Sequence, residues 1–172
     1  MKKKTLIILI ACATIGIATI QSCKEKTEDI SQEFIADNST FSENASWSLD
    51  KTFNGPDPLL GATAHANNDE KIIREVRFKN GQNPLNLKYP VGTLIVKHSY
   101  NPDGTVNEYT AMAKRGNNFN PNGGDWEFFV LTSSGSIATD ENGMPMRGAT
   151  LMNGMCLGCH SAASSKDYVF SK

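Results

Sequence analysis

The pentapeptide Cys-Leu-Gly-Cys-His at residues 156–160 constrains this chain more than any other part of its sequence. Two intervening residues place the sulfurs of Cys156 and Cys159 about one helical turn apart, where they can reach the two vinyl groups of one porphyrin. The histidine that follows is then directed at the iron. This spacing is typical of covalent attachment of a c-type haem. We therefore predict one haem c, attached through Cys156 and Cys159, with His160 as the proximal iron ligand.

Two other kinds of site also use closely spaced cysteines. A structural zinc site would require a further thiolate or imidazole at ligand spacing. A thioredoxin-like redox pair would require a surrounding pattern of alternating strands and helices. The sequence shows neither context, so haem attachment is the interpretation we favour.

The first 22 residues resemble the signal peptide of a bacterial lipoprotein. Three lysines follow the first methionine, an apolar run covers residues 6–20, and Gln21-Ser22 precede Cys23. Such a segment is removed on export, and the cysteine that follows it accepts lipid. The alternative is an uncleaved transmembrane anchor, for which this apolar run is slightly short. We predict a signal peptide over residues 1–22 and lipid attachment at Cys23.

Residues 23–44 are rich in polar and charged side chains and poor in apolar ones, which predicts a flexible tether. Residues 45–172 then form one haem domain of ordinary size. Several acyl chains would hold this domain stably at a bacterial membrane, on the extracytoplasmic side, facing the periplasm or at the cell surface. The formal net charge of −1, without a basic run, argues against a nucleic-acid partner.

The central part of the chain has the pattern of an antiparallel sheet. Aromatic and β-branched residues are frequent in four runs, and turn residues such as Asn-Pro-Asp-Gly at 101–104 separate them. The predicted class is α+β, an antiparallel sheet of four to five strands with a few short helices and the haem attached on a C-terminal helix. The expected strands cover residues 72–78, 92–100, 106–114 and 126–132, and the expected helices cover 59–66 and 149–159.

The position of the haem motif excludes two common architectures. Small electron-transfer cytochromes c carry the motif near the N-terminus and supply a methionine ligand from far downstream. Here only twelve residues follow His160, and none of them is Met or His. Four-helix cytochromes c′ carry the motif near the C-terminus, but four strands do not form a helix bundle. Any sixth iron ligand must therefore come from upstream.

Four segments, in order, resemble one family. They are Tyr-Pro-Val-Gly-Thr-Leu-Ile-Val-Lys at 89–97, Ala-Met-Ala-Lys-Arg-Gly at 111–116, Phe-Asn-Pro-Asn-Gly-Gly-Asp-Trp-Glu at 119–127, and the haem motif through Asp-Tyr-Val-Phe at 167–170. Over residues 47–170 the chain resembles the cytochrome P460 family, which includes the cytochromes c′-beta. The resemblance implies an antiparallel sheet and an iron open on its distal side. Members either oxidise hydroxylamine, using a lysine cross-linked to the haem edge, or bind nitric oxide and carbon monoxide in an apolar pocket.

The resemblance makes Lys97 the first candidate for a haem cross-link, with Lys114 second and Lys88 third. Side chains alternate along a strand, so Lys97 and His98 cannot both face the haem. Lys97 on the haem face would permit a cross-link, whereas His98 there would fill the sixth position and make an electron carrier. His65 and Met112 are further candidate ligands from upstream.

Oxidation of hydroxylamine also requires a proton acceptor, for which Asp125 and Glu127 are candidates, and Arg115 is a candidate for stabilising an anion. Phe128 and Phe129 point to opposite faces of their strand, so at most one of them can line the distal pocket. We expect a haem protein that binds, and as an enzyme would oxidise, hydroxylamine or nitric oxide and pass electrons to an external redox acceptor. The alternatives are a gas-binding or sensing protein, for nitric oxide or carbon monoxide, and a six-coordinate electron carrier. A homodimer is compatible with each of them.

Overall fold

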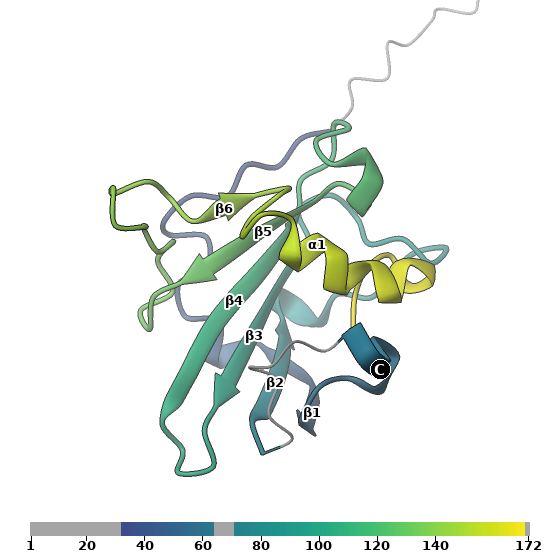
Figure 1. Cartoon of the computed structure of the whole chain (residues 1–172). Helices are drawn as coiled ribbons and strands as arrows, with labels where there is room; N and C mark the ends of the chain where they lie inside the picture. Colours follow the sequence, from purple (N-terminus) through teal and green to yellow (C-terminus); the bar gives the residue numbers. More distant parts are fainter. Residues whose placement is uncertain (1–31, 64–70, 171–172) are drawn as a thin grey trace, which may run out of the picture. The chain divides into compact units, whose positions relative to one another are not determined.

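The computed structural model describes residues 32–63 and 71–170. These residues form one antiparallel sheet, in which every strand pairs with its neighbour in the sequence (Figure 1). The expected signal peptide, the lipid-acceptor Cys23 and His65 lie outside the described residues. The strands are β1 (Ser48–Asn54), β2 (Ile73–Phe78), β3 (Leu94–Tyr100), β4 (Val106–Lys114), β5 (Trp126–Leu131) and β6 (Arg147–Gly148).

The helical elements are short, and most of them are 3-10 helices. Within the described part of the chain, the one α-helix is α1 (Met155–His160), which carries the haem motif. No helix of this part is both long enough and apolar enough to span a bilayer. The α+β class and the C-terminal helix with its cysteines are confirmed. The 3-10 helices are Asn44–Ser46, Pro58–Thr63, Lys79–Gly81, Pro121–Gly123 and Ser161–Lys166.

The hairpin between β3 and β4 forms where the sequence predicts it. The amide of Gly104 donates to the carbonyl of Asn101 at 2.9 Å, and the amide of Asn101 donates to the carbonyl of Thr105 at 2.8 Å. Gly104 has a φ of 82°, a left-handed conformation that glycine adopts without steric cost. This turn fixes the register in which Lys97 pairs with Thr110.

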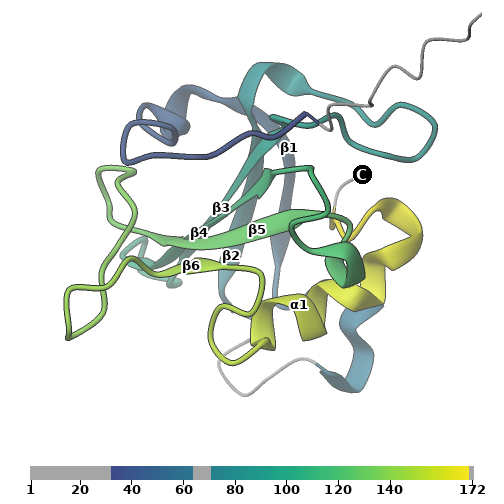
Figure 2. The same ribbon diagram turned by 90° about the horizontal axis from the view of Figure 1, so that it is seen from above.

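Side chains alternate between the two faces of the sheet, and each face has its own core. We call the faces the N-terminal face and the pocket face, after what covers them (Figure 2). The N-terminal face carries Leu94, Val96, Ala111, Ala113, Phe129 and Leu131, packed against Ala36, Phe41, Trp47 and Ile137. The pocket face carries Val76, Phe78, Ile95, Met112, Trp126 and Phe128, packed against Tyr89, Val169 and, at the edge, Cys156 and Leu157.

The described part of the expected tether belongs to the domain, which corrects the predicted boundary at residue 44. Phe41 is fully buried, and its ring centroid lies 4.9 Å from that of Phe129. The guanidinium of Arg147 donates to the carbonyl of Ala36 at 2.7 Å. Ala36 and Phe41 are buried apolar residues among polar neighbours, and they pack this segment onto the domain. The average composition of the segment does not reveal them.

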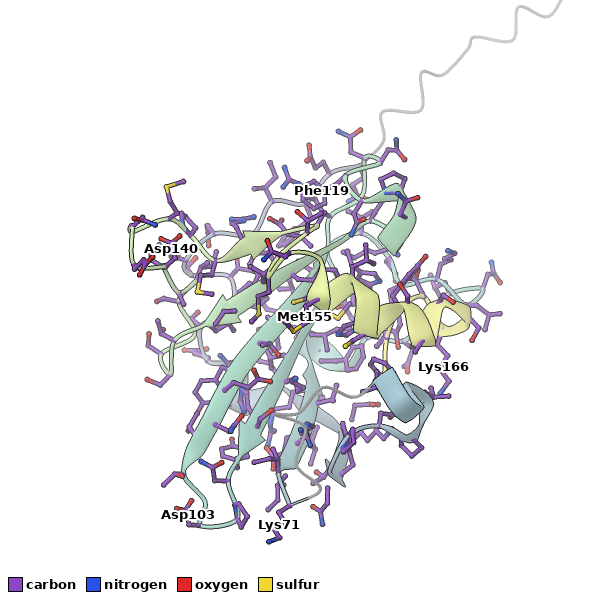
Figure 3. The ribbon with its side chains drawn as sticks, viewed as in Figure 1. Lys71, Asp103, Phe119, Asp140, Met155 and Lys166 are labelled. Carbon is purple, nitrogen blue, oxygen red and sulfur yellow. The ribbon has the colours of Figure 1, made fainter. Side chains whose placement is uncertain are left out.

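The C-terminal helix is shorter than the expected 149–159. Met152, Asn153 and Gly154 have φ values of 54°, 54° and 81°, and left-handed residues cannot continue an α-helix. The helix therefore begins at Met155. Figure 3 shows Met155 at the start of this helix, whereas Phe119 lies in the loop before β5. Strand β1 and the two-residue β6 were not expected from the sequence.

Candidate functional site

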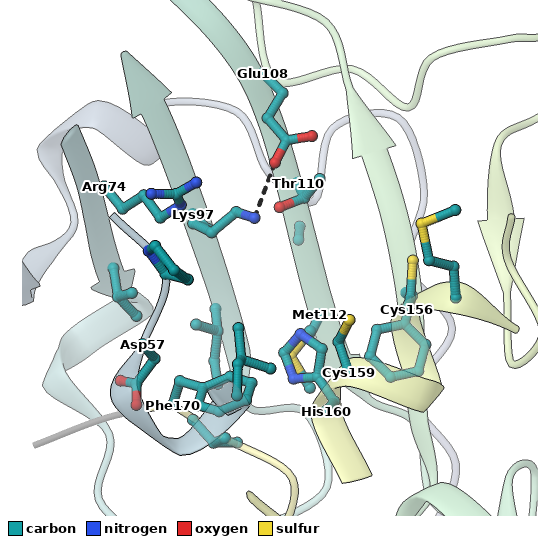
Figure 4. A pocket seen from close by; sticks show the side chains of 18 of the residues that line it. Asp57, Arg74, Lys97, Glu108, Thr110, Met112, Cys156, Cys159, His160 and Phe170 are labelled. Carbon is teal, nitrogen blue, oxygen red and sulfur yellow. Dashed lines mark ion pairs between the residues drawn. The ribbon is translucent and has the colours of Figure 1, made fainter. Parts of the chain in front are cut away.

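A cavity of about 920 Å³ lies against the pocket face of the sheet, with α1 and the C-terminal segment forming its other wall. Its volume falls in the upper range of sites that hold a cofactor or other small molecule. The cavity has an apolar end around the haem motif and a polar end around Lys97 and Glu108, farther along the same strands (Figure 4). The residues of the apolar end include Val76, Ile95, Met112, Phe128, Val169 and Phe170, and those of the polar end include Arg74, Lys97, Asn101, Asn107, Glu108 and Thr110.

The three residues of the haem motif all line this cavity. Helix α1 places Cys156, Cys159 and His160 along one wall. Both cysteines are free and half-buried. Burial raises the pKa of the Cys156 thiol, and the nearby charge of Lys97 opposes that shift. The two sulfurs and one imidazole are therefore presented together to the cavity, as attachment of a porphyrin requires.

His160 is oriented by a single hydrogen bond to the backbone. Its Nδ1 lies 2.7 Å from the carbonyl oxygen of Tyr168, and since a carbonyl only accepts, Nδ1 carries the proton. Nε2 is then the unprotonated nitrogen, which is the one that ligates a metal. Desolvation lowers the pKa of His160 to about 4, with the hydrogen bond to Tyr168 opposing the shift and the charge of Lys97 adding to it. The imidazole is neutral at neutral pH, as a ligand must be.

Two aromatic rings hold the His160 imidazole from the sides. The ring centroids of Phe128 and Phe170 each lie 5.2 Å from the centroid of His160. Phe129, next along β5, belongs to the core of the N-terminal face. The two phenylalanines thus belong to the cores of opposite faces, as predicted, although both are among the residues that line the cavity. Phe128 accompanies the motif histidine.

Lys97 and Glu108 form an ion pair at the polar end. Lys97 Nζ lies 2.9 Å from Glu108 Oε1, across the β3–β4 pair (Figure 4). The two side chains are 34% and 46% exposed, and half-exposed pairs contribute little to folding stability. Sequence reasoning named Lys97 but missed Glu108. The signal was present in the hairpin, because Glu108 is two residues from Thr110, the partner of Lys97, and so shares its face.

The buried Asp57 is a second carboxylate of the cavity, but it is already paired. Lys51 Nζ donates to Asp57 Oδ2 at 2.6 Å, and the amide of Leu59 donates to Oδ1 at 3.0 Å. Burial raises the pKa of Asp57, but these two hydrogen bonds together with the charges of Lys51 and Lys166 more than offset it, so the pKa lies below its ordinary value. Asp57 remains charged and held by its own partners, which leaves Glu108 as the carboxylate of the polar end.

His98 faces the opposite side of the sheet from Lys97. Its Nε2 lies 2.7 Å from Asn44 Oδ1, and its Nδ1 lies 3.2 Å from the hydroxyl oxygen of Tyr100. The ring centroid of Tyr109 is 4.7 Å away. His98 therefore packs within the N-terminal face and is excluded as a sixth iron ligand. The mutual exclusion of Lys97 and His98 is confirmed, and Lys97 is the residue on the pocket face.

The other lysine candidates are placed elsewhere. Lys114 is buried and pairs with Asp167 at 2.7 Å, while Lys88 is 69% exposed and lies 3.6 Å from the same carboxylate. Neither lysine lines the cavity. Lys97 is thus the one lysine of the described residues whose side chain belongs to the cavity wall.

The carboxylates proposed as proton acceptors also lie elsewhere. Glu127 is buried on the N-terminal face, where Arg147 binds it at 2.7 Å and Arg115 lies 3.4 Å away. Asp125 accepts from the amide of Asn120 at 3.1 Å in the loop before β5. None of these residues lines the cavity. The prediction for Asp125, Glu127 and Arg115 was wrong, because proximity to Trp126 in the sequence does not determine the face of the strand.

The donor set fits a haem better than a bare metal ion. Among the described residues, no group of three or more His, Cys, Asp or Glu side chains converges as an ion site would require. Two thiols, one neutral imidazole and a large cavity with an apolar end instead match the requirements of a covalently attached porphyrin. The zinc alternative has no support in the described part of the chain.

Comparison with known families gives one match. The family model described as Cytochrome P460 matches residues 68–171, which is more than half of the chain. This range includes the haem motif and strands β2–β6. Searches of the curated proteins and of the solved structures gave no match.

Proposed function

This chain belongs to the cytochrome P460 family, and from that premise we propose that it is a monohaem c-type protein that binds small nitrogen species. Family membership implies a haem cofactor. Cys156 and Cys159 would form the two thioether bonds, and His160 Nε2 would be the axial ligand. The single observation that carries the proposal is that these three residues share one cavity with the Lys97–Glu108 pair.

The polar end of the cavity supports chemistry on a protic nitrogen substrate. The bound haem supplies a redox-active iron, at which hydroxylamine or nitric oxide would be held and electrons withdrawn. Oxidation of hydroxylamine to nitric oxide releases protons and electrons in equal numbers, so it requires a proton acceptor in the protein and an external one-electron acceptor. Glu108 is a half-exposed carboxylate that can accept these protons one at a time and pass each to solvent, and Lys97 holds its side chain in position.

Gas binding without turnover is the second candidate function, and one observation favours it. The Lys97 ammonium pairs with Glu108 at 2.9 Å, so the lysine already has a partner other than a haem edge. The apolar end, with Met112, Phe128 and Phe170, suits a small uncharged ligand such as nitric oxide or carbon monoxide. The electron-carrier alternative loses its strongest histidine, because His98 faces away.

We further propose that the domain works outside the cytoplasm, tied to a bacterial membrane by lipid on Cys23. The N-terminal sequence supports this proposal through its lysines, its apolar run and the residues beside Cys23. An extracytoplasmic position would also place the domain beside external electron acceptors.

The test is to compare the haem-loaded chain with Lys97→Ala and the matched control Lys88→Ala, whose lysine is exposed and outside the cavity. Hydroxylamine oxidation is followed with a one-electron acceptor dye, nitric oxide binding by absorption, and cross-linking by mass spectrometry of haem peptides. Turnover that Lys97→Ala abolishes and Lys88→Ala retains, with Lys97 on the haem peptide, supports the oxidase. Reversible nitric oxide binding without turnover supports the gas binder. Absence of both contradicts the proposed function.

A further inference from the structure

The carbonyl that orients His160 belongs to an unusual stretch of backbone. Asp167 and Tyr168 have φ values of 54° and 66°, which makes them two successive left-handed residues, neither of them glycine. Their combined turn directs the Tyr168 carbonyl at His160 Nδ1, at 2.7 Å. Such a conformation persists only where surrounding contacts enforce it.

Asp167 is the centre of those contacts. Its Oδ2 accepts from Lys114 Nζ at 2.7 Å and from the amide of Tyr89 at 2.8 Å. Its backbone carbonyl accepts from Trp126 Nε1 at 2.7 Å. Three donors from three separate places in the chain thus fix both the side chain and the peptide of Asp167, one residue before the carbonyl that binds His160.

The neighbouring loop closes the remaining space. Gly124 has a φ of 59°, and a Cβ built there would lie 2.9 Å from Asp167 Oδ1 and 3.0 Å from the Tyr168 ring. The Tyr168 hydroxyl donates to the carbonyl of Asn122 at 2.8 Å. The Tyr168 amide donates to the carbonyl of Ala163 at 2.9 Å, so Tyr168 is held at its backbone and, through its hydroxyl, by the loop.

The Lys114–Asp167 ion pair is also almost completely buried, which stability alone does not favour. The Lys114 side chain is 9% exposed and that of Asp167 is fully buried. Asp167 Oδ1 accepts no hydrogen bond from the described residues and has only Lys88 Nζ, at 3.6 Å. Burying charges in this way is often no better for stability than apolar packing. A role in geometry explains why the pair occupies this position.

We propose that Lys114 and Asp167 are positioning residues for the proximal haem ligand. By holding the Asp167–Tyr168 turn, they keep the Tyr168 carbonyl on His160 Nδ1 and so maintain the electron-donor strength of the imidazole toward iron. A hydrogen bond at the second ring nitrogen of a ligating histidine raises its basicity and fixes its orientation. The inference rests on the proposed function, because it requires His160 to be the iron ligand.

Asp167→Asn tests the proposal in the haem-loaded chain, because it keeps the shape and removes the charge. We expect the ferrous iron–histidine stretching frequency to fall and the reduction potential to rise. Perturbing outer-shell partners of metal ligands changes affinity or activity by roughly tenfold or more. A tenfold change in the reduction equilibrium corresponds to about 59 mV for a one-electron couple. Trp126→Phe, which removes the donor to the Asp167 carbonyl, should shift both quantities in the same direction.

Glu127→Gln is the matched control. It disrupts the ion pair of another buried carboxylate, with Arg147 at 2.7 Å, on the other face of the same sheet. Glu127→Gln should leave both quantities at their wild-type values, and Lys114→Arg, which keeps the charge and the donor, should stay near them. Thermal unfolding identifies any variant that fails to fold. If Asp167→Asn fails to fold, the comparison of Trp126→Phe with Lys114→Arg decides the question.

Two results would overturn the inference. One is a wild-type stretching frequency and potential in Asp167→Asn or Trp126→Phe with haem attached. The other is an equal shift in Glu127→Gln, which would show a general effect of destabilisation. Failure of the haem assignment on which the inference rests is distinguishable, because the wild-type chain would then carry no haem, or carry it without an iron–histidine stretch that His160→Ala removes; loss of nitric oxide binding and turnover alone would contradict only the proposed function.

Discussion

Lys97 and His98 are neighbours in β3, yet their side chains lie on opposite faces of the sheet. Lys97 lines the same cavity as the haem motif, whereas His98 hydrogen-bonds Asn44 on the N-terminal face. A single peptide bond thus joins Lys97, a residue of the site, to His98, a residue of the core. Substitutions at these two positions should have separate effects.

His98→Gln should leave the absorption spectrum of the haem unchanged while reducing stability. The amide of glutamine can still donate toward Asn44, but it loses the ring packing against Tyr109. A cost of about 1–3 kcal/mol is ordinary for disturbing a buried hydrogen-bonded group. Absorption spectra and denaturant unfolding of the same samples check both parts. A changed ligation spectrum would show that His98 reaches the iron after all.

The same residue gives a prediction for pH. Burial is the main cause that lowers the pKa of His98, with the charge of Arg77 adding to it and Glu75 opposing it. Below the ordinary histidine pKa of about 6.5, His98 is protonated in the unfolded chain but binds a proton less readily in the folded chain. Because the unfolded state then binds more protons, stability must fall as pH falls. Denaturant unfolding between about pH 7.5 and 5.5 should show this fall, and His98→Gln should make it shallower. Parallel curves for the two proteins would refute this assignment.

Phe41→Ala should destabilise the domain although Phe41 lies in a segment of polar composition. Its side chain is fully buried against Phe129 and Trp47. Deletion of a buried phenylalanine ring costs about 3–5 kcal/mol. The control is Ile35→Ala, since Ile35 is 61% exposed and a surface substitution should change stability by no more than about 0.5 kcal/mol. Equal effects of the two substitutions would mean that this segment does not pack on the sheet.

Glu108→Gln should slow hydroxylamine oxidation while haem content stays constant. Loss of a positioned proton acceptor reduces a rate by roughly 10²–10⁴-fold, whereas a half-exposed ion pair contributes little to stability. Asn107→Ala is a suitable control, because it alters the same end of the cavity without removing a carboxylate. Unchanged turnover in Glu108→Gln would exclude this residue as the acceptor.

Local sequence patterns were sufficient for the central strands and for the haem motif. The predicted strand 106–114 coincides with β4, because the turn before it and the loop after it are marked by Asn, Asp and Gly. The spacing of Cys156, Cys159 and His160 along the chain led to the haem prediction, and the structure places all three on the wall of one cavity. Lys97 became a candidate through the resemblance to the family. Strand alternation predicted only that Lys97 and His98 lie on opposite faces, not which of them faces the pocket.

The features that were missed depend on contacts between distant segments. Glu108 becomes part of the site through the register of β3 and β4. The Tyr168 carbonyl is directed by Asp167, which in turn is held by Lys114 and Tyr89 from earlier parts of the chain. No local pattern predicts two left-handed residues at 167 and 168, since neither is glycine. The shorter α1 likewise follows from left-handed residues that composition does not reveal.

Mass spectrometry of haem peptides, combined with alkylation of free thiols, tests the central claim most directly. The haem-loaded chain is treated with an alkylating reagent after unfolding, digested, and examined for the peptide that contains Cys156, Cys159 and His160. The account predicts that this peptide carries the mass of one haem and that neither cysteine is alkylated. Recovery of the same peptide without haem and with both thiols alkylated, from a protein that contains haem, would contradict it.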